Sequence, residues 1–344
     1  MKLGRLKTAL IGFGRIGQGY ALDPLMQRYF PYGTHAQVLR DHPSFDWQSV
    51  VDTNQQALDS ARVNWNIKHV ASDVKSLSCS EEIEVAVLAT GPQERLKQLD
   101  NMPNLKAVLV EKPLGSSLDE ANQFVDYCKS RKIALQVNLL RRADEYTNQL
   151  KNGLLYSRIG KVQAAFGIYG NGILNNGTHM VDLCRLLFGE VLWVQANMQA
   201  KAFAYGPIAG DLNFPFQIYT QSGVLVNFQA VDFRHYRENS LDIWGEQGRL
   251  GYYHGGLTIV ESQSKPNRAM TGEREIAVDK VMQRDSTIGN AMYRMYTNLF
   301  EYLLGETELC STGESALQTQ AVIESILQSY QHNGRTYAST KSPS

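Results

Sequence analysis

The chain has 344 residues, of which 43% are hydrophobic and 20% charged, a composition typical of a globular protein with about two domains. Its 34 basic and 34 acidic residues cancel, which argues against a nucleic-acid or membrane-surface partner. No apolar run approaches the roughly 20 residues of a membrane-spanning helix. The four cysteines lack CxxC spacing and the histidines lack metal-ligand spacing, so we expect a cytoplasmic location and no metal site.

A glycine-rich motif follows the first predicted strand, Thr8–Ile11. The six residues of this motif have GxGxxG spacing and are Gly12, Phe13, Gly14, Arg15, Ile16 and Gly17. Glycines at this spacing permit a tight turn and allow a pyrophosphate to approach the N-terminus of the next helix. The motif therefore predicts a dinucleotide-binding site.

The second predicted strand, Trp47–Val51, ends at Asp52. A carboxylate at this position binds the ribose hydroxyls of NAD, and no arginine directly follows it to accept the 2′-phosphate of NADP, which favours NAD over NADP. Asp52 lies 35 positions after Gly17, against roughly 20 in the usual motif. We therefore expect an inserted loop at Gly19–Gly33, which either lies near the cofactor crevice or is peripheral and without a role.

Strands and helices alternate over the first part of the chain. Apolar runs at Glu84–Leu88, Ala107–Val110 and Ile133–Val137 predict three further strands, and the capping box Ser117–Glu120 predicts a helix between the last two. This βαβ alternation predicts an α/β protein whose N-terminal domain, residues 1–137, is a Rossmann fold with a doubly wound parallel sheet.

The pattern changes after residue 137. We expect a helix over Arg142–Asn152 that ends at Gly153, a strand over Ile159–Tyr169, and strands with glycine turns from Leu192 to about Val278. Helices are predicted at 290–304 and 314–330. These elements predict an α+β domain over residues 138–344 with a large, mostly antiparallel, open sheet.

Two loops at the ends of predicted strands carry candidate residues. Thr90 and Gly91 follow one strand, and Glu111, Lys112 and Pro113 follow the next. Ligands bind at the carboxyl edge of an open α/β sheet, so we assign Thr90, Gly91, Glu111 and Lys112 to the cofactor site. A partly desolvated lysine at such an edge can exchange a proton near neutral pH. The alternative interpretation is a surface lysine beside a turn.

His179 is the most informative histidine. Gly177 predicts a helix that starts just before it, and the helix dipole would then help to keep the imidazole neutral. Asp182 lies three residues further on the same face, where its carboxylate can orient the ring. The alternative is a histidine packed over Leu183 and Leu186.

These motifs, in this order and spacing, resemble the Gfo/Idh/MocA family of sugar and polyol oxidoreductases. The segments that carry the resemblance are Gly12–Gly17, Glu111-Lys112-Pro113, Ile159–Val162, Gly177–Asp182 ahead of Leu186–Gly189, and Trp244–Leu250. The resemblance implies an NAD(P)-binding domain and a second domain whose open sheet mediates homodimers or homotetramers. It also implies that Lys112 and His179 form a proton-handling pair for a carbohydrate-like substrate, and that a cis peptide bond precedes Pro113.

Two departures from the family pattern concern the chemistry. Many members carry an aspartate four residues before the histidine, where this chain has Asn175, and a histidine in the loop that here reads Thr90-Gly-Pro-Gln93. Because an amide cannot accept a proton at neutral pH, the role of base shifts to Lys112 and His179.

The sequence supports one main hypothesis, an NAD-dependent dehydrogenase or ketone reductase that acts on a sugar, polyol or sugar derivative. Candidate substrate-binding residues are Arg141, Arg142, Tyr169, Asn171, Asn175, Asn176 and His179. One alternative is an NAD-retaining glycosidase or lyase that oxidises its sugar transiently. Another is a non-catalytic regulatory protein that senses NAD or sugar.

Overall fold

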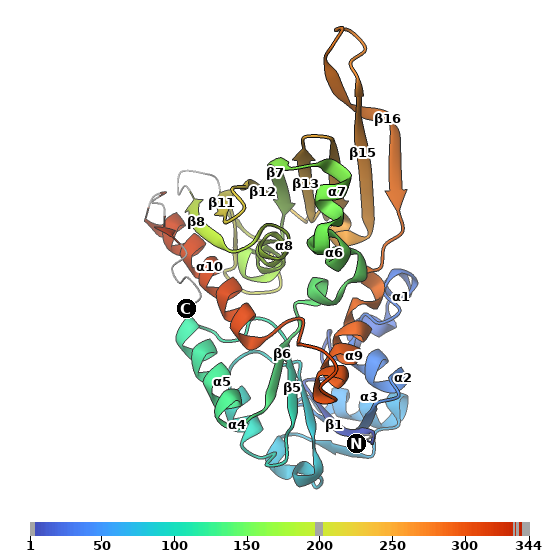
Figure 1. Cartoon of the computed structure of the whole chain (residues 1–344). Coiled ribbons are helices and arrows are strands. Elements are labelled where there is room, and N and C mark those ends of the chain that lie inside the picture. The colour runs from blue at the N-terminus through green and yellow to red at the C-terminus, as the bar shows by residue number, and fades with distance from the viewer. Residues whose placement is uncertain (1–3, 197–201, 333, 335–336, 339–344) are drawn as a thin grey trace. The chain divides into compact units, whose positions relative to one another are not determined.

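The computed structural model describes residues 4–196, 202–332, 334 and 337–338 (Figure 1). The chain divides into two compact units. Unit 1 comprises Met1–Asp144 and Gly289–Leu317, and unit 2 comprises Glu145–Ile288 and Gln318–Ser344. This division differs from the predicted domains in two places. The first boundary lies at Asp144 instead of residue 137, and the segment Gly289–Leu317, predicted for the second domain, belongs to unit 1.

Unit 1 is built on a six-stranded parallel sheet with the order β3-β2-β1-β4-β5-β6. Its strands are β1 (Leu6–Ile11), β2 (Phe45–Val51), β3 (His69–Ala71), β4 (Val85–Leu88), β5 (Ala107–Val110) and β6 (Ala134–Val137). The predicted Rossmann sheet is confirmed; the three-residue strand β3 was not predicted. The strand order reverses between β1 and β4, and in such sheets ligands bind at the carboxyl ends of the strands beside this point.

Helices cover both faces of this sheet. The helices of unit 1 are α1 (Pro24–Tyr29), α2 (His35–Asp41), α3 (Gln55–Trp65), α4 (Arg95–Leu99), α5 (Leu118–Ser130) and α9 (Ala291–Leu303). Short 3₁₀ turns are η1 (Gly19–Leu22), η2 (Val74–Ser76), η3 (Ser80–Glu82), η4 (Leu140–Ala143) and η8 (Ile288–Asn290). Figure 1 shows α4 and α5 on one face of the sheet and α2, α3 and α9 on the other, and each group forms its own apolar core.

The predicted insertion Gly19–Gly33 folds as η1 and α1. After it, the chain returns to the glycine turn, where the backbone N–H of His35 donates to the carbonyl of Ile16 at 3.1 Å. Helix α2 therefore begins beside the glycine motif. The inserted residues, η1 and α1, account for the long spacing between Gly17 and Asp52. Tyr32, at the end of the insertion, packs against Tyr293 of α9 with ring centroids 4.7 Å apart.

Unit 2 contains a nine-stranded sheet with the order β16-β15-β14-β13-β7-β12-β11-β8-β17. Its strands are β7 (Val162–Tyr169), β8 (Val191–Ala196), β11 (Phe216–Thr220), β12 (Leu225–Ala230), β13 (Ser240–Gly245), β14 (Gly248–Tyr253), β15 (Thr258–Pro266), β16 (Arg274–Arg284) and β17 (Tyr337–Ala338). The predicted, mostly antiparallel sheet is confirmed, with the pair β7 and β12 as the parallel exception. Strands β9 (Phe203–Ala204) and β10 (Leu212–Asn213) form a separate pair. Residues 197–201, which the strand prediction also covered, lie outside the described residues.

The helices of unit 2 pack against one face of this sheet. They are α6 (Glu145–Gln149), α7 (Leu155–Ile159), α8 (Thr178–Phe188) and the greater part of α10 (Gly313–Gln331), with the π-helical turns η5 (Leu150–Leu154) and η6 (Ile173–Gly177) and the 3₁₀ turn η7 (His254–Gly256). Apolar residues of α8 and α10 and of the central strands form one core.

Two predicted boundaries in unit 2 are wrong. The helix expected over Arg142–Asn152 begins at Glu145 instead. Its predicted end is confirmed, because Asn152 and Gly153 have non-helical dihedral angles, with a φ of 108° at Gly153, and α7 follows after this turn. Ile159, predicted to begin a strand, is the last residue of α7, and the strand begins at Val162. Gly160, with a φ of 76°, allows the chain to turn between them.

Two further observations concern the described residues as a whole. Cys79, Cys128 and Cys184 are buried thiols. None of the helices in the described ranges is long and apolar enough to cross a lipid bilayer.

Candidate functional site

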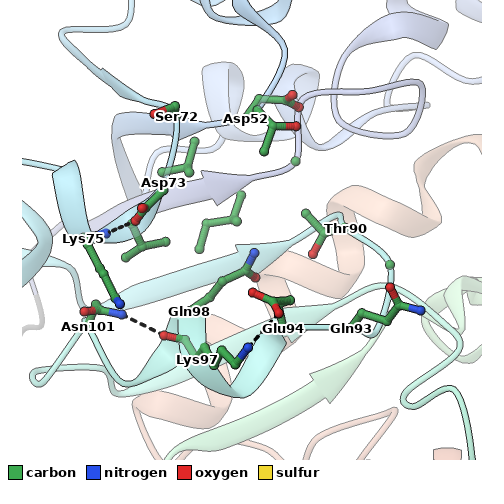
Figure 2. Close-up of a pocket in the computed structure, with 16 residues that line it drawn as sticks. Asp52, Ser72, Asp73, Lys75, Thr90, Gln93, Glu94, Lys97, Gln98 and Asn101 are labelled. Atoms are coloured by element: carbon green, nitrogen blue, oxygen red, sulfur yellow. Dashed lines mark hydrogen bonds and ion pairs between the residues drawn. The ribbon is translucent and has the colours of Figure 1, made fainter.

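A pocket of about 490 Å³ opens at the carboxyl edge of the unit 1 sheet (Figure 2). The ends of β1, β2 and β4, the turn η2 and helix α4 line it. Figure 2 shows Asp52 and Asp73 on one side of the pocket and the side chains of α4, including Gln98, on the other. Thr90 and Gly91, predicted for the cofactor site, also line this pocket. It lies where the strand order reverses, the position at which open α/β sheets bind their ligands.

The glycines of the motif differ in what a side chain would meet. Gly12 has a φ of 92°, and a Cβ there would lie 2.8 Å from the carbonyl carbon of Ala89. A Cβ at Gly17 would lie 2.6 Å from the carbonyl oxygen of Gly12, whereas a Cβ at Gly14 has nothing within 4 Å. The packing of the chain itself therefore requires Gly12 and Gly17. Gly14 borders open space, as expected where the pyrophosphate of a dinucleotide approaches the backbone.

Asp52 is fixed beside this turn by backbone hydrogen bonds. Its Oδ2 accepts from the N–H of Phe13 at 2.6 Å, and its Oδ1 accepts from the N–H of Asn54 at 2.8 Å. The carboxylate therefore has a set orientation at the pocket, as binding of ribose hydroxyls requires. These features fit a bound dinucleotide.

The other members of the motif have different surroundings. The Phe13 ring is buried and packs near Trp47 and Trp65, with centroids 6.1 and 6.4 Å away. The ring belongs to the core, so the assignment of Phe13 to the cofactor site stays a prediction that concerns its backbone. Arg15 is exposed, and Ile16 is half-buried against the core of unit 1.

The turn after β5 carries the expected cis peptide bond between Lys112 and Pro113. Glu111 is held immediately before it, since its Oε1 accepts from Nδ2 of Asn138 at 2.6 Å and lies 3.1 Å from Nε2 of His35. Burial acts to raise the pKa of Glu111, but the hydrogen bonds with His35 and Asn138 outweigh it and lower the pKa. Glu111 is therefore an ionised anchor of the turn, and Lys112 follows it, half-buried.

Sequence reasoning missed four residues that fix this turn. Nδ1 of His35 lies 2.7 Å from the hydroxyl of Tyr296, so a hydrogen-bonded chain runs from α9 through α2 to Glu111. Asn138 directly follows β6 at the same sheet edge as Glu111, a position that could have indicated it. His35 and Tyr296 carry no such signal, because they are far from Glu111 in the sequence. Arg95, which also contacts this turn, was missed for the same reason.

In unit 2, His179 lies half-buried in the first turn of α8. The helical backbone nevertheless starts earlier than predicted, because η6 runs into α8 without a break and Gly177 has a helical φ of −54°. The backbone amides of Leu174 and Asn175 lie in the first turn of this continuous helix. Both donate to the carboxylate of Asp211, at 3.0 and 3.1 Å. The dipole argument for a neutral His179 is therefore corrected, since the helix begins a turn earlier and a carboxylate caps it.

Asp182 belongs to a buried polar network. Its Oδ1 accepts from the hydroxyl of Thr319 at 2.8 Å and lies 3.6 Å from Nη1 of Arg185, which also pairs with Glu190. These contacts join α8 to α10 and to the start of β8. Asp182 thus has a structural role, and its orientation of His179 stays a prediction.

The predicted substrate residues divide into three groups. Tyr169 is fully buried, and its hydroxyl donates to the carbonyl of Phe214 at 2.7 Å and accepts from the N–H of Phe214 at 3.0 Å, so its assignment to the substrate pocket is corrected to the core. Asn171, Asn175 and Asn176 lie together on the segment before α8. Nδ2 of Asn176 is buried and has no hydrogen-bond partner among the described residues.

Arg141 and Arg142 form the third group and lie on η4 in unit 1, largely buried. A metal centre was not predicted, and the described part of the chain contains no cluster of three or more His, Cys, Asp or Glu side chains that could hold a metal ion.

Comparison with known families identifies the class of protein. Residues 6–139 match the NAD-binding Rossmann fold of the GFO/IDH/MocA oxidoreductase family, and residues 169–338 match the C-terminal alpha/beta domain of the same family. The chain therefore belongs to the Gfo/Idh/MocA family of oxidoreductases, and unit 1 contains its NAD-binding domain.

Individual relatives are distant in sequence. The uncharacterized oxidoreductase YrbE of Bacillus subtilis is 22% identical over 157 residues, which are 45% of this chain and 42% of that protein. This chain thus spans less than half the length of that curated relative.

Solved structures show the same fold over nearly the whole chain. An oxidoreductase from Agrobacterium radiobacter in complex with NAD+, L-tartaric acid and magnesium has a TM-score of 0.73 and 18% identity, and the match covers 97% of this chain and 98% of that one. Levoglucosan dehydrogenase in complex with NADH and levoglucosan has a TM-score of 0.74 and 15% identity, with 98% and 100% covered.

Proposed function

We propose that this protein is an NAD-dependent dehydrogenase or ketone reductase that acts on the CH–OH group of a sugar, polyol or sugar derivative. The observation that carries the proposal is the pocket at the reversal point of the Rossmann sheet, which Gly12 and Asp52 line and where two backbone amides fix the Asp52 carboxylate. Gly14, in the adjoining glycine turn, borders open space. When bound, NAD supplies a nicotinamide ring that accepts or donates a hydride.

Asp52 is the proposed determinant of cofactor choice. Its carboxylate accepts hydrogen bonds from ribose hydroxyls, and its charge repels the 2′-phosphate of NADP. Three carboxylates line the pocket, those of Asp52, Asp73 and Glu94, against two lysines, Lys75 and Lys97. Lys97 is paired with Glu94 at 2.7 Å. The balance of charge around the pocket therefore supports NAD over NADP.

Lys112 is the proposed acid–base residue. It lies in the turn that Glu111 anchors at the carboxyl edge of the sheet, so its amine is presented from a fixed backbone. The substrate hydroxyl must lose its proton when the carbon is oxidised, and positioned acid–base help is worth roughly 10² to 10⁴ in rate. His179 of unit 2 is the proposed second proton-handling residue, whose imidazole can orient a substrate hydroxyl or relay its proton.

The proposed substrate class rests on the polar residues and on the relatives. Asn171, Asn175 and Asn176 offer amide donors and acceptors that suit hydroxyl groups, and Arg141 and Arg142 would suit an anionic group. Levoglucosan dehydrogenase, which shares the fold, is in complex with a sugar derivative.

A substrate panel tests the proposal. The purified protein is mixed with NAD+ or NADP+ and with monosaccharides, polyols and sugar acids in turn, and reduction is followed at the absorbance of the reduced nicotinamide. We expect reduction with at least one of these alcohols and a preference for NAD+. Reduction of neither cofactor by any member of the panel, or a clear preference for NADP+, would contradict the proposal.

A second candidate function is suggested by Asn175, which cannot accept a proton. It is a protein that retains its NAD, either for a transient oxidation during glycoside cleavage or elimination, or for sensing. Native mass spectrometry of the purified protein and the substrate panel together discriminate between these functions. Retained NAD in the mass spectrum, with no net NADH formed in the panel, supports the second candidate.

We also propose that the protein forms a homodimer or homotetramer through the nine-stranded sheet and is located in the cytoplasm. Phe166 of β7 and Leu192 of β8 present exposed apolar side chains, which such an interface would cover. The buried thiols of Cys79, Cys128 and Cys184 suit a reducing compartment. The same native mass spectrum reports the number of subunits.

A further inference from the structure

Arg95 is the first residue of α4, and its side chain is buried, with 1% exposed. Its guanidinium donates three hydrogen bonds, all to backbone carbonyls. Nη1 donates to Pro113 at 2.7 Å and to Leu114 at 3.1 Å, and Nη2 donates to Thr90 at 2.6 Å. One side chain thus joins two loops that follow neighbouring strands of the sheet.

This arrangement is unusual for a buried arginine. A buried charge is costly, and a carboxylate within hydrogen-bonding distance normally balances it. Arg95 instead meets neutral carbonyl groups, and its Nε is buried without a hydrogen-bond partner among the described residues. Burial lowers the pKa of Arg95 to about 10, so the side chain is still charged at neutral pH. An apolar side chain could not donate to these three carbonyls, so the guanidinium is needed to join the two loops in this way.

Both loops belong to the edge that binds the cofactor. Thr90 lines the pocket after β4, and Pro113 is joined to Lys112 by the cis peptide bond after β5. His35 and Asn138 hold Glu111, on the side of the turn before Lys112. Arg95 holds the carbonyls on the side after it, so the backbone is fixed on both sides of Lys112.

We propose that Arg95 is a positioning residue, which holds the turn carrying Lys112 at a set distance from the Thr90 loop and so places the Lys112 amine for proton transfer. This inference rests on the proposed function of Lys112. Arg95 acts through the backbone of the turn and does not touch the reacting atoms.

The test compares R95K with a matched control, R131K. Lysine keeps the charge but cannot span three carbonyls in two loops. Arg131 also donates to backbone carbonyls in unit 1, including that of Pro103 at 3.2 Å, but it does not line the pocket. For R95K we expect kcat to fall by about 10-fold to 100-fold, while the Kd of NADH changes by less than about 3-fold. R131K is expected to leave both quantities unchanged.

A double-mutant cycle shows whether Arg95 acts through Lys112. If it does, R95K combined with K112M is no slower than K112M alone, because the residue that Arg95 positions is already absent. If the effect of R95K is instead fully retained in the K112M background, the inference is overturned.

Hydrogen exchange provides a readout that needs no substrate. Peptides covering residues 89–93 and 111–116 are expected to exchange faster in R95K than in the wild-type protein and in R131K. Unchanged exchange in both loops overturns the inference even if the enzyme is active. Failure of the proposed function appears differently, as unchanged turnover in K112M. If R95K does not fold, R95Q replaces it in the same measurements, since a neutral amide leaves no buried charge.

Discussion

At the scale of single residues, a substitution at Gly14 should weaken cofactor binding without affecting folding. A Cβ at this position meets nothing within 4 Å, so G14A should fold normally, with a Tm within about 2 °C of the wild type. The added methyl group occupies the space where the dinucleotide backbone approaches, so we expect the Kd of NADH to rise by at least about 10-fold. Differential scanning calorimetry and fluorescence titration measure the two quantities.

G12A is the control for this prediction. Gly12 has a φ of 92° and no room for a Cβ beside Ala89, so G12A should lower the Tm as well as the affinity. Unchanged NADH affinity in G14A would mean that the open space beside this residue is not part of the dinucleotide site.

Asp52 allows a test of cofactor selectivity. Replacement by asparagine removes the negative charge, so D52N should discriminate less against NADP+. The NH₂ group of the asparagine would face a backbone N–H that now donates to Asp52, so D52N should also bind NAD+ more weakly. We expect the ratio of kcat/KM for the two cofactors to fall by about 10-fold. D73N is the control, because Asp73 lines the same pocket but caps η2. A ratio that falls as far in D73N as in D52N would assign the selectivity to the charge of the whole pocket.

The residue scale also shows what the sequence could and could not predict. Asp52 and Lys112 were identified because each follows a strand, and strand ends in a parallel sheet share one edge. Tyr169 was assigned wrongly to the substrate pocket, because a position at the end of a strand does not reveal whether a ring points into a pocket or into the core. The contact of Arg95 with the Lys112 turn depends on tertiary packing, which no local pattern reports.

At the scale of secondary-structure elements, the contact between α2 and α9 should be sensitive to pH. His42, at the end of α2, is buried, and burial lowers its pKa from 6.5 to about 4. Its Nδ1 accepts from the N–H of Ser44 at 3.3 Å, and its Nε2 lies 3.1 Å from the hydroxyl of Thr297 on α9. Protonation would place a second donor opposite the Ser44 amide.

The sign of this pH dependence follows from the direction of the shift. Between pH 6.5 and about 4 the unfolded chain binds a proton at His42 and the folded chain does not, so the stability from this residue is complete above pH 6.5 and is lost as pH falls. In H42Q the free energy of unfolding should depend less on pH, by about 2 kcal/mol between pH 7 and pH 4 after allowance for solvent screening. Urea unfolding at several pH values measures it, with H235Q, at an exposed histidine, as the control. Parallel curves for H42Q and the wild type would contradict the prediction.

Elements were predicted more reliably than their boundaries. The insertion Gly19–Gly33 was located because the spacing between two motifs was too long, although its fold as η1 and α1 was not predicted. The start of the helix before His179 was placed too late, because a glycine suggested a cap. Gly177 instead has helical dihedral angles, and the cap is Asp211, a residue from a distant loop.

At the scale of the whole molecule, unit 1 needs two separate pieces of the chain. Apolar residues of α9, including Met295, Tyr296 and Leu299, lie in the same core as Leu10 and Phe45. A fragment of residues 1–144 lacks these side chains, so we expect it not to fold by itself. A fusion of residues 1–144 to residues 289–317 through a glycine-rich linker should fold and bind NADH.

Circular dichroism and NADH fluorescence test this prediction on both fragments. Cooperative unfolding of the fragment 1–144 alone would contradict it. The sequence did not reveal this division, because the amphipathic pattern of α9 predicts a helix with one buried face but does not say which sheet that face covers. A continuous boundary at residue 137 was the simplest interpretation of the pattern.

The central claim is that Lys112 handles the proton in an NAD-dependent reaction, and K112M tests it most directly. Lys106, which precedes the same strand at its other end and forms an exposed ion pair with Glu84, provides the control K106M. With the substrate found in the panel, we expect K112M to bind NADH as the wild type does and to lose about 10²-fold to 10⁴-fold in kcat, while K106M keeps both properties. Wild-type turnover in K112M would contradict the account.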